Sequence, residues 1–318
     1  MTTGIRAGAN ASETRLAYVS ESAWGTTPST PGYQNLRYTG ESLNVDTTNT
    51  TSNEIRADRN VSDLIKIGSG ASGGINFELS YSTLDDLLEG VFQSTWSSDV
   101  LKNGQTAKSF SLEKTIELGA SDEYLRYTGM VPNTFSLDVT AGQIITGSVD
   151  FMGKGGATSA SAISGSTYTS ANTKGVMSAA NDFASLSLDS LSPTPSIQTI
   201  SLNINNNLRA QQAVGSVDAV GIGSGRFEVT GSLQAYFESK ALYDNYLNAT
   251  AGSLSFTLGS VTSEKYTISL PNIKLSSGRV VAGGNDQDVM TEINFQALYD
   301  TSGSPANNCT AILTRGVS

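Results

Sequence analysis

The side chains that most enzymes use for proton transfer are scarce in this chain. Its 318 residues include no histidine and a single cysteine, Cys309, together with 29 acidic and 19 basic residues. Histidine is the commonest general base and the commonest metal ligand, so its absence excludes Ser-His-Asp and Cys-His catalysis and every His-containing zinc site. Any chemistry would have to rest on carboxylates, and one cysteine excludes an intrachain disulfide.

Paired acidic residues could perform acid–base chemistry or bind calcium, and three such pairs occur: Asp85-Asp86, Asp122-Glu123, and Asp286 with Asp288. The first pair suits the positive N-terminal end of a helix. The other two stand in turn-like sequence without EF-hand spacing, so solvated turns explain them better. We therefore predict no catalytic, cofactor-binding or metal-binding residue, and we expect that the chain is not an enzyme.

A glycine-rich stretch from Gly147 to Lys154 invites comparison with a phosphate-binding loop. That loop needs four residues between its glycines, whereas five separate Gly147 from Gly153, and Gly155 stands where Ser or Thr belongs. The stretch also follows a predicted strand without opening a helix. Nucleotide binding is therefore not expected.

One charged segment is predicted to be functional. Glu54, Arg56, Asp58, Arg59 and Asp63 lie in a polar loop, residues 46–63, without a clear periodicity. Long loops in compact domains tend to be functional, and alternating charges on a loop can pair with a neighbouring chain and fix its register. A contact between subunits and a solvated loop are equally compatible with these residues.

The composition favours strands over long helices. Charged residues make up 15% of the chain, and Ser, Thr, Asn and Gly dominate its polar share, whereas surface helices favour Glu, Lys and Arg. The net charge of −10 and the pI near 4.5 disfavour tight binding to nucleic-acid phosphates. No run approaches the roughly 18 apolar residues of a membrane span, and no signal-peptide core is recognisable. We therefore expect synthesis in a cytoplasm and no contact with a membrane.

Hydrophobic periodicity predicts antiparallel strands and two helices. Five apolar residues from Leu84 to Phe92 follow helical spacing, and Ser82 or Thr83 can cap that helix. A second helix is expected near residues 239–248. Alternating and apolar runs predict strands at residues 36–45, 75–81, 108–118, 123–130, 133–139, 144–152, 196–205, 227–237, 253–259, 265–271, 273–275 and 289–298.

Three short strings recur in the same order along the chain, which indicates an internal duplication. They are Ser42–Asp46 with Ser201–Asn205, Ile67–Gly70 with Ile222–Gly225, and Val131–Asn133 with Leu270–Asn272. The fold class is therefore expected to be mainly β, with two tandem copies of an antiparallel β-barrel or sandwich, each flanked by one helix. The expected organisation is an N-terminal arm 1–35, a β domain 36–156, a Ser/Ala/Gly-rich linker or excursion 157–192, a second β domain 193–300 and a tail 301–318.

Several stretches resemble the tail tube (major tail) proteins of bacteriophages with long, non-contractile tails. The similarity is clearest over residues 15–155 and is carried by residues 37–44, 51–64, 76–88, 124–131 and 147–155. The resemblance implies a structural virion protein of β-barrel type with a flanking helix. Its rings would stack into the hollow tube that conducts DNA during ejection. These are structural signatures, so no active-site residue is carried over.

In this family single-unit members form hexameric rings, so a duplicated chain implies three copies per ring, with hexamers as the second choice. The implied partners are further copies of the chain and the tape-measure, tail terminator and distal tail proteins. Genomic DNA would pass through without specific binding, and the loop 46–63 and the arm 1–35 are candidates for contacts between rings. An alternative is a β-sandwich on the virion surface that binds host glycans. An enzyme that uses carboxylates alone is weakly supported.

Overall fold

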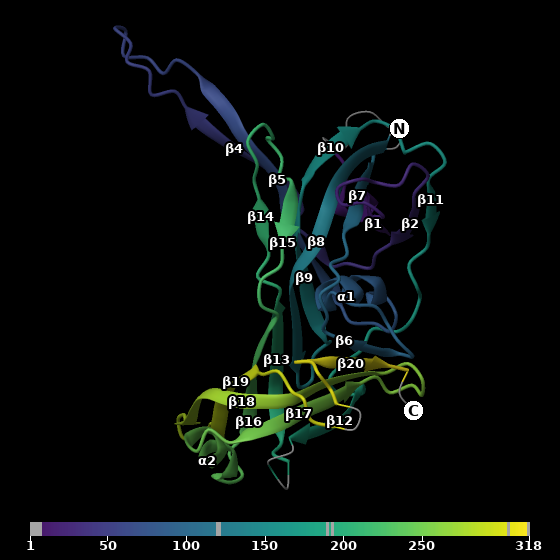
Figure 1. Cartoon of the computed structure of the whole chain (residues 1–318). Coiled ribbons are helices and arrows are strands. Elements are labelled where there is room, and N and C mark those ends of the chain that lie inside the picture. The colour runs from purple at the N-terminus through teal and green to yellow at the C-terminus, as the bar shows by residue number, and fades with distance from the viewer. Residues whose placement is uncertain (1–7, 119–121, 189–190, 192–193, 304–305, 317–318) are drawn as a thin grey trace.

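The computed structural model describes the chain except residues 1–7, 119–121, 189–190, 192–193, 304–305 and 317–318. The predicted fold class is confirmed, because the described residues are mainly antiparallel strands with two α-helices. Figure 1 shows the N-terminal half of the chain above the C-terminal half, with one long strand, β8, running between them. A hairpin of β4 and β5 projects away from the rest of the chain.

Five strands of the N-terminal half pair antiparallel in one order, and we call them with helix α1 the first unit. Along the sheet they are β4 (Asn44–Thr51), β5 (Leu64–Glu78), β9 (Thr146–Gly153), β8 (Asp122–Thr140) and β7 (Phe110–Glu117). Helix α1 (Asp85–Phe92) lies between β5 and β7 in the sequence and packs on β8. Its predicted apolar face enters the core, although Leu84 and not Ser82 or Thr83 occupies its N-cap position.

Five strands of the C-terminal half pair in the same order, and with helix α2 (Ala241–Leu247) they form the second unit. Along the sheet they are β13 (Ile197–Asn205), β16 (Glu228–Tyr236), β19 (Val289–Ala297), β18 (Tyr266–Ala282) and β17 (Ala251–Leu258). Helix α2 falls between β16 and β17, as α1 falls between β5 and β7. The two units therefore share one topology.

The remaining elements complete and connect the two units. Those of the N-terminal half are η1 (Ala11–Glu13), β1 (Thr14–Ser20), β2 (Gly32–Asn35), β3 (Gly40–Glu41) and β6 (Val100–Lys102). Those that follow β9 are β10 (Gly155–Ser159), β11 (Thr167–Thr169), β12 (Phe183–Leu188), β14 (Arg209–Gln211), β15 (Gly221–Gly223) and β20 (Ile312–Arg315). Strand β20 pairs with β18 of the second unit and with β6, so the C-terminal segment bridges the two halves.

The two units meet along a strand junction and do not close into barrels. The second half of β8 pairs with β13, from Thr134 opposite Asn205 to Thr140 opposite Thr199. This edge of β8 is therefore taken by the second unit and is not available to β4, which would have to close the first unit. The expected barrel is thus replaced by open sheets packed around one core.

Three segments differ from the sequence-based expectation. Residues 14–20, expected in an extended arm, form the buried strand β1, which pairs with β7 almost 100 residues later. In the expected loop 46–63, residues 46–51 belong to strand β4, whereas residues 52–63 form the connection from β4 to β5. The segment 157–192, expected to be a linker or excursion, is attached to the molecule by β11, which pairs with β2, and by the buried side chain of Met177.

The recurring strings match the topology only in part. Ser201–Asn205 lies within β13, and Ser42–Asp46 covers the two residues before the corresponding strand β4 and its first three residues. Ile67–Gly70 lies within β5, whereas Ile222–Gly225 covers the end of β15 and the residues after it. The duplication itself stays a prediction, because two units with one topology do not by themselves establish a common origin.

Candidate functional site

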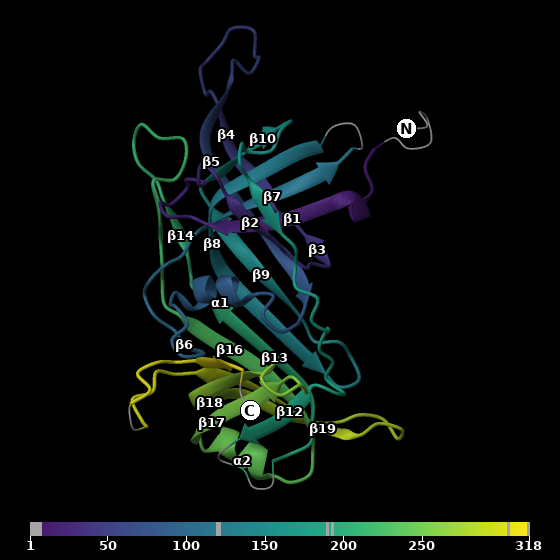
Figure 2. The same cartoon turned by 90° about the vertical axis from the view of Figure 1, so that its right-hand side faces the viewer.

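The charged segment that the sequence singled out lies at the tip of the β4–β5 hairpin (Figure 2). Of its five residues, Arg56 and Asp58 are brought together in a two-pronged ion pair, with Nε–Oδ1 at 3.1 Å and Nη2–Oδ2 at 2.9 Å. The hydrogen bonds from Arg56, followed by those from Asn60, lower the pKa of Asp58 to about 2. Glu54, Arg59 and Asp63 are exposed, with Asp63 accepting a bond from the Leu64 amide.

Exposed apolar side chains accompany these charges. Ile55 at the tip is fully exposed, and Val61, Leu64, Ile65 and Ile67 follow it along the hairpin. A soluble chain rarely leaves such a cluster of apolar residues in water unless another surface covers it. The tip is therefore a candidate site for contact with a surface outside this chain.

A second hairpin, which sequence reasoning missed, connects β13 to β16 through β14 and β15. It occupies the same place in the second unit that the β4–β5 hairpin occupies in the first. It rests on the first unit, where the Ser69 amide donates a 3.0 Å hydrogen bond to the Val217 carbonyl. One of the two hairpins thus lies against a neighbouring unit within the chain, and the other projects freely.

One face of the continuous sheet is built almost entirely from polar side chains, and we call it the polar face. Both helices pack on the opposite, apolar face, which holds residues such as Phe135, Leu137 and Leu202. The polar face carries Asn44 and Asp46 on β4, Ser72 and Asn76 on β5, Ser148 and Asp150 on β9, Ser136 and Asp138 on β8, Ser201 and Asn203 on β13, Thr230 and Ser232 on β16, Asn294 and Gln296 on β19, and Lys274 and Arg279 on β18. Strict alternation along each strand separates the two faces.

The charges on the polar face are mostly negative. Its carboxylates are Asp46, Glu78, Asp138, Asp150, Glu228 and Glu292, whereas its two cations, Lys274 and Arg279, both lie on β18. Hydroxyl groups of the next strand hold two of these carboxylates, since Ser201 donates to Asp138 at 2.6 Å and Thr134 donates to Asp150 at 2.8 Å. The face therefore offers acceptors and short hydroxyl groups, and little that would bind a phosphate backbone.

Several strands keep an open edge, and two of these edges correspond to the strands that meet in the junction between the units. Among the described residues, β4 pairs only with β5 along its length, and the part of β18 beyond Lys274 pairs only with β19. Open edges of this kind are templates for pairing with another chain. Together with the free hairpin, these edges are the clearest candidate binding features of the molecule.

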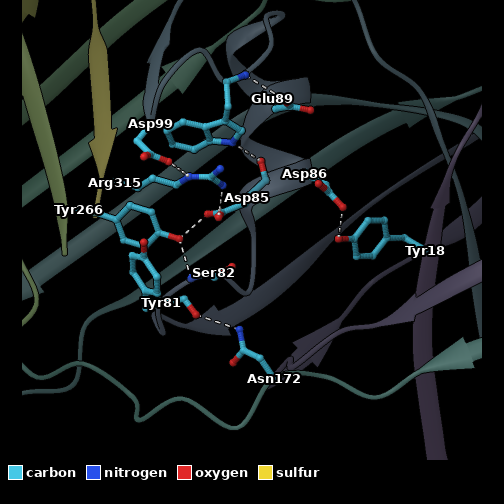
Figure 3. A network of polar contacts seen from close by, with 11 residues as sticks. Tyr18, Tyr81, Ser82, Asp85, Asp86, Glu89, Asp99, Asn172, Tyr266 and Arg315 are labelled. Atoms are coloured by element: carbon cyan, nitrogen blue, oxygen red, sulfur yellow. Dashed lines mark hydrogen bonds and ion pairs between the residues drawn. The ribbon is translucent and has the colours of Figure 1, made fainter. Parts of the chain in front are cut away.

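A partly buried polar network connects the two units (Figure 3). The Asp85 carboxylate of α1 accepts hydrogen bonds from Tyr266 of β18 at 2.5 Å and from Arg315 of β20 at 2.6 Å. Arg315 also reaches Asp99 at 3.0 Å, and Tyr18 of β1 donates to Asp86 at 2.9 Å. Burial, followed by the nearby Asp85 charge, raises the pKa of Tyr266 well above its usual range. Burial and Asp86 do the same for Tyr18.

This network is structural in its geometry. Arg315 and Tyr266 use the Asp85 carboxylate as a shared acceptor between the units. The Arg315 guanidinium lies over the Trp96 ring, whose Nε1–H donates to the Asp85 backbone carbonyl at 3.1 Å. Sequence reasoning assigned Asp85 and Asp86 to the first turn of a helix, which the structure confirms, but it gave no sign of their distant partners. No group of three His, Cys, Asp or Glu side chains that could hold a metal occurs within the described ranges.

An open, mainly β chain with unpaired strand edges and a projecting hairpin is typical of a structural protein. A family model described as phage tail tube protein matches residues 11–297, and the chain belongs to that family. It is therefore a structural component of the virion tail, as the resemblance predicted, and the family favours this function over glycan binding. No curated protein matches the chain. Across the described residues, none of the helices is long and apolar enough to cross a membrane.

Proposed function

We propose that three copies of this chain close into a ring of six similar units, and that the rings stack into the tube of the phage tail. The observation that carries this proposal is the junction between β8 and β13, where one unit already continues the sheet of another. The open edge of β4 and the open end of β18 are the matching halves of a further junction. A head-to-tail contact of this kind closes into a ring when its rotation allows.

We infer that the β4–β5 hairpin, with Arg56 and Asp58 at its tip, contacts the adjacent ring. The exposed apolar residues of this hairpin support the contact, because an adjacent ring would bury them. Its charged residues would form ion pairs with that ring. Stacking is the open-ended contact that turns rings into a filament. Tape-measure protein would fill the tube during assembly, and tail terminator and distal tail proteins would cap its ends.

We infer that the polar face lines the lumen and that genomic DNA passes over it during ejection. A face with six carboxylates and two cations repels phosphate, so DNA would slide and not bind. Asp138→Lys together with Asp150→Lys should convert the lumen into a surface that binds DNA in a salt-dependent manner. Co-sedimentation of DNA fragments with tubes measures this, and Glu117→Lys with Asp244→Lys is a control of equal charge change.

Electron microscopy of the purified protein tests the proposed function. Tubes or rings with a central channel are the expected result. A sample that holds only dispersed single chains under all polymerising conditions would contradict it. A ring of six whole chains, the second choice, would keep the tube function but reject the count of three.

A further inference from the structure

The junction inside the chain gives the register of the junction between chains. We propose that β18 of one copy pairs antiparallel with β4 of the next copy, and that this pairing repeats the register of β8 with β13. The proposal rests on the ring assembly proposed above and adds to it the strands, their direction and their residue pairs. A second copy of the same chain is the only occupant that it requires for either edge.

Irregularities in the ladders show which residues of the two units correspond. Pairing of β8 with β9 shifts between Pro132 and Thr134, and pairing of β18 with β19 shifts between Leu275 and Ser277. Bulges break a ladder at particular positions and are features of the strand, so they mark equivalent places. Thr134 therefore corresponds to Ser277, and each later residue of β8 corresponds to the residue 143 positions further on in β18.

A second pair of bulges, one in each unit, gives the same correspondence between residues of β8 and β18. Pairing of β7 with β8 shifts between Phe110 and Leu112, opposite Met130 and Tyr127. Pairing of β17 with β18 shifts between Gly252 and Leu254, opposite Ile273 and Leu270. Met130 thus matches Ile273 at the same spacing of 143 residues that the first bulge gives. The repeated string Val131–Asn133 with Leu270–Asn272 implies a spacing of 139 residues, so these strings do not occupy equivalent places in the two strands.

Two glycines align the other pair of strands, β4 and β13. A Cβ atom added to Gly73 would come within 2.3 Å of the Ser42 carbonyl oxygen, and one added to Gly231 would come within 2.3 Å of the Ser201 carbonyl oxygen. Both glycines thus allow the same close approach of the first strand to the second. Ser42 therefore corresponds to Ser201, which is the alignment that the repeated sequence string also gives.

Transferring the register of β8 with β13 now fixes the residue pairs between copies. Leu137 opposite Leu202 becomes Val280 opposite Leu43 of the next copy, and Ser136 opposite Asn203 becomes Arg279 opposite Asn44. The full set runs from Ser277 opposite Asp46 to Ala282 opposite Glu41. Val280 and Leu43 would meet on the core side, and Ser277 with Asp46 and Arg279 with Asn44 would meet on the polar face, so the alternation of the sheet continues across this part of the junction. At its end, Val281 opposite Ser42 and Ala282 opposite Glu41 would each pair an apolar with a polar residue.

Exposure of the side chains agrees with a missing partner at this place. Leu137 and Leu202 are each 2% exposed in the completed junction, whereas Val280 is 39% exposed. Pairing with β4 would bury Val280 beside Leu43. Burial of apolar surface is the main favourable term in most associations of protein chains.

The backbone of β4 presents the groups that the pairing needs. The Ser42 amide bonds to the Gly74 carbonyl on β5, so the neighbouring Leu43 points its backbone groups to the open side. There the Leu43 amide donates to the Glu41 carboxylate at 2.9 Å, and the Leu43 carbonyl accepts from the Tyr127 hydroxyl at 3.1 Å. In the single chain the Glu41 carboxylate thus accepts the hydrogen bond of the Leu43 amide, which limits non-specific pairing of this edge. In the ring, the backbone carbonyl of Val280 from the next copy would accept that hydrogen bond in place of Glu41.

The end of the incoming strand also has space. The register carries the turn between β18 and β19, residues 283–288, past Gly40 and Glu41 of the next copy. These two residues border an open cleft of about 840 Å³. The turn therefore passes over a recess of the neighbouring copy.

Cysteine pairs test the register directly. In the proposed junction Arg279 and Asn44 face each other on the polar face, where both side chains are exposed in the single chain. Arg279→Cys with Asn44→Cys should form a disulfide on mild oxidation. The matched control is Arg279→Cys with Ser42→Cys, which shifts the pair by two residues to about 7–8 Å, beyond the reach of a disulfide. The two single variants report any contribution from the buried Cys309.

The expected result is a set of covalent species that ends at three chains on a non-reducing gel, formed with the first pair and not with the shifted pair. Electron microscopy of the same samples separates the two proposals. Rings or tubes without the disulfide, or with equal crosslinking by the shifted pair, would overturn the junction and leave the proposed function standing. Absence of rings and tubes from the parent protein would overturn both.

Discussion

The completed junction between the two units and the open edges at their outer ends differ in one respect above all. In the completed junction β13 covers β8, and the apolar side chains at its centre are buried. Among the described residues, the outer edge of β4 and one edge of β18 beyond Lys274 have no partner strand, and Val280 remains exposed. The chain therefore contains, between β8 and β13, a complete example of the strand pairing that the open edges of β4 and β18 lack.

The two hairpins repeat this contrast. The β14–β15 hairpin lies on β5 of the first unit, whereas the β4–β5 hairpin has charged and apolar residues at a free tip. A partner within the chain holds the first hairpin. The second would need a partner from outside, which fits a chain that is built to assemble.

The largest expected effect comes from placing a charge on the open end of β18. Val280→Asp should leave the single chain folded, because residue 280 is partly exposed to water there. In a ring the carboxylate would be buried beside Leu43 without a partner, at a cost of several kcal/mol for each junction. We expect loss of rings and tubes in sedimentation.

Val261→Asp is the matched control, since Val261 is exposed in the turn before β18, away from both open edges. It should assemble as the parent protein does. Normal assembly of Val280→Asp would remove β18 from the contact between copies.

Cutting back the completed junction should instead affect folding. Leu137→Ala removes a fully buried side chain, which typically lowers the free energy of unfolding by about 2–5 kcal/mol. Val280→Ala, at the corresponding open position, should change it by less than about 0.5 kcal/mol. Denaturant unfolding of the unassembled chain measures the free energy of unfolding of both variants. Equal losses of this free energy would contradict the view that Leu137 lies in a completed junction and Val280 at an open edge.

Ionisation of Tyr266 in the polar network should make the free energy of unfolding decrease as the pH rises above 10.0. Because the pKa of Tyr266 is raised in the folded chain, its contribution is present below the ordinary value of 10.0 and is lost as the pH rises above it. Tyr266→Phe cannot ionise, so its free energy of unfolding should fall less steeply between about pH 9 and 11. Urea unfolding across this range measures the slope.

Tyr299→Phe serves as the control, because Tyr299 is an exposed tyrosine outside the network. It should keep the slope of the parent protein. An unchanged slope in Tyr266→Phe would indicate that ionisation of Tyr266 is not linked to unfolding.

The smallest expected effect concerns the free hairpin. Arg56→Ala should not change the unfolding of the single chain, because the Arg56–Asp58 pair is exposed, but it should shorten the tubes if this tip contacts the next ring. The lowered pKa of Asp58 keeps its charge above pH 3.8, and the pairing is lost only as the pH falls toward 2. The pair stays ionised between about pH 5 and 8, so its titration should not change tube length over this range.

Arg209→Ala is the matched variant in the hairpin that the chain already holds. Its expected tube length, measured in electron micrographs, is that of the parent protein. Shortening by both variants alike would remove the distinction between the two hairpins.

Local patterns in the sequence predicted the elements that depend on local spacing. The apolar positions from Leu84 to Phe92 predicted α1 to within a residue or two, and strict alternation predicted most strands of both units. Two expected breaks, at Pro132 and at residues 271–272, are not strand ends but bulges within the long strands β8 and β18. A proline at a bulge loses no ladder hydrogen bond, so it does not have to end the strand.

Features that depend on distant pairing could not be predicted. Leu16, Ala17 and Tyr18 are buried because β7 pairs with them, and nothing near them in the sequence indicates that partner. The composition of residues 157–182 predicted exposure, which most of their side chains have, but it did not indicate that β11 pairs with β2. The charged tip was found from its residue types, whereas the open edges, which carry the proposed assembly, follow only from knowing which strands are paired.

Rotational symmetry of the assembled ring tests the account most directly. End-on views of tubes or single rings in the electron microscope, averaged without imposed symmetry, should show three repeats around the channel, each composed of two similar lobes. Native mass spectrometry of a single ring should give three times the 33.2 kDa mass of the chain. A ring of six chains with twelve lobes would contradict the account, because the open edges would then not complete the junction that the chain already contains.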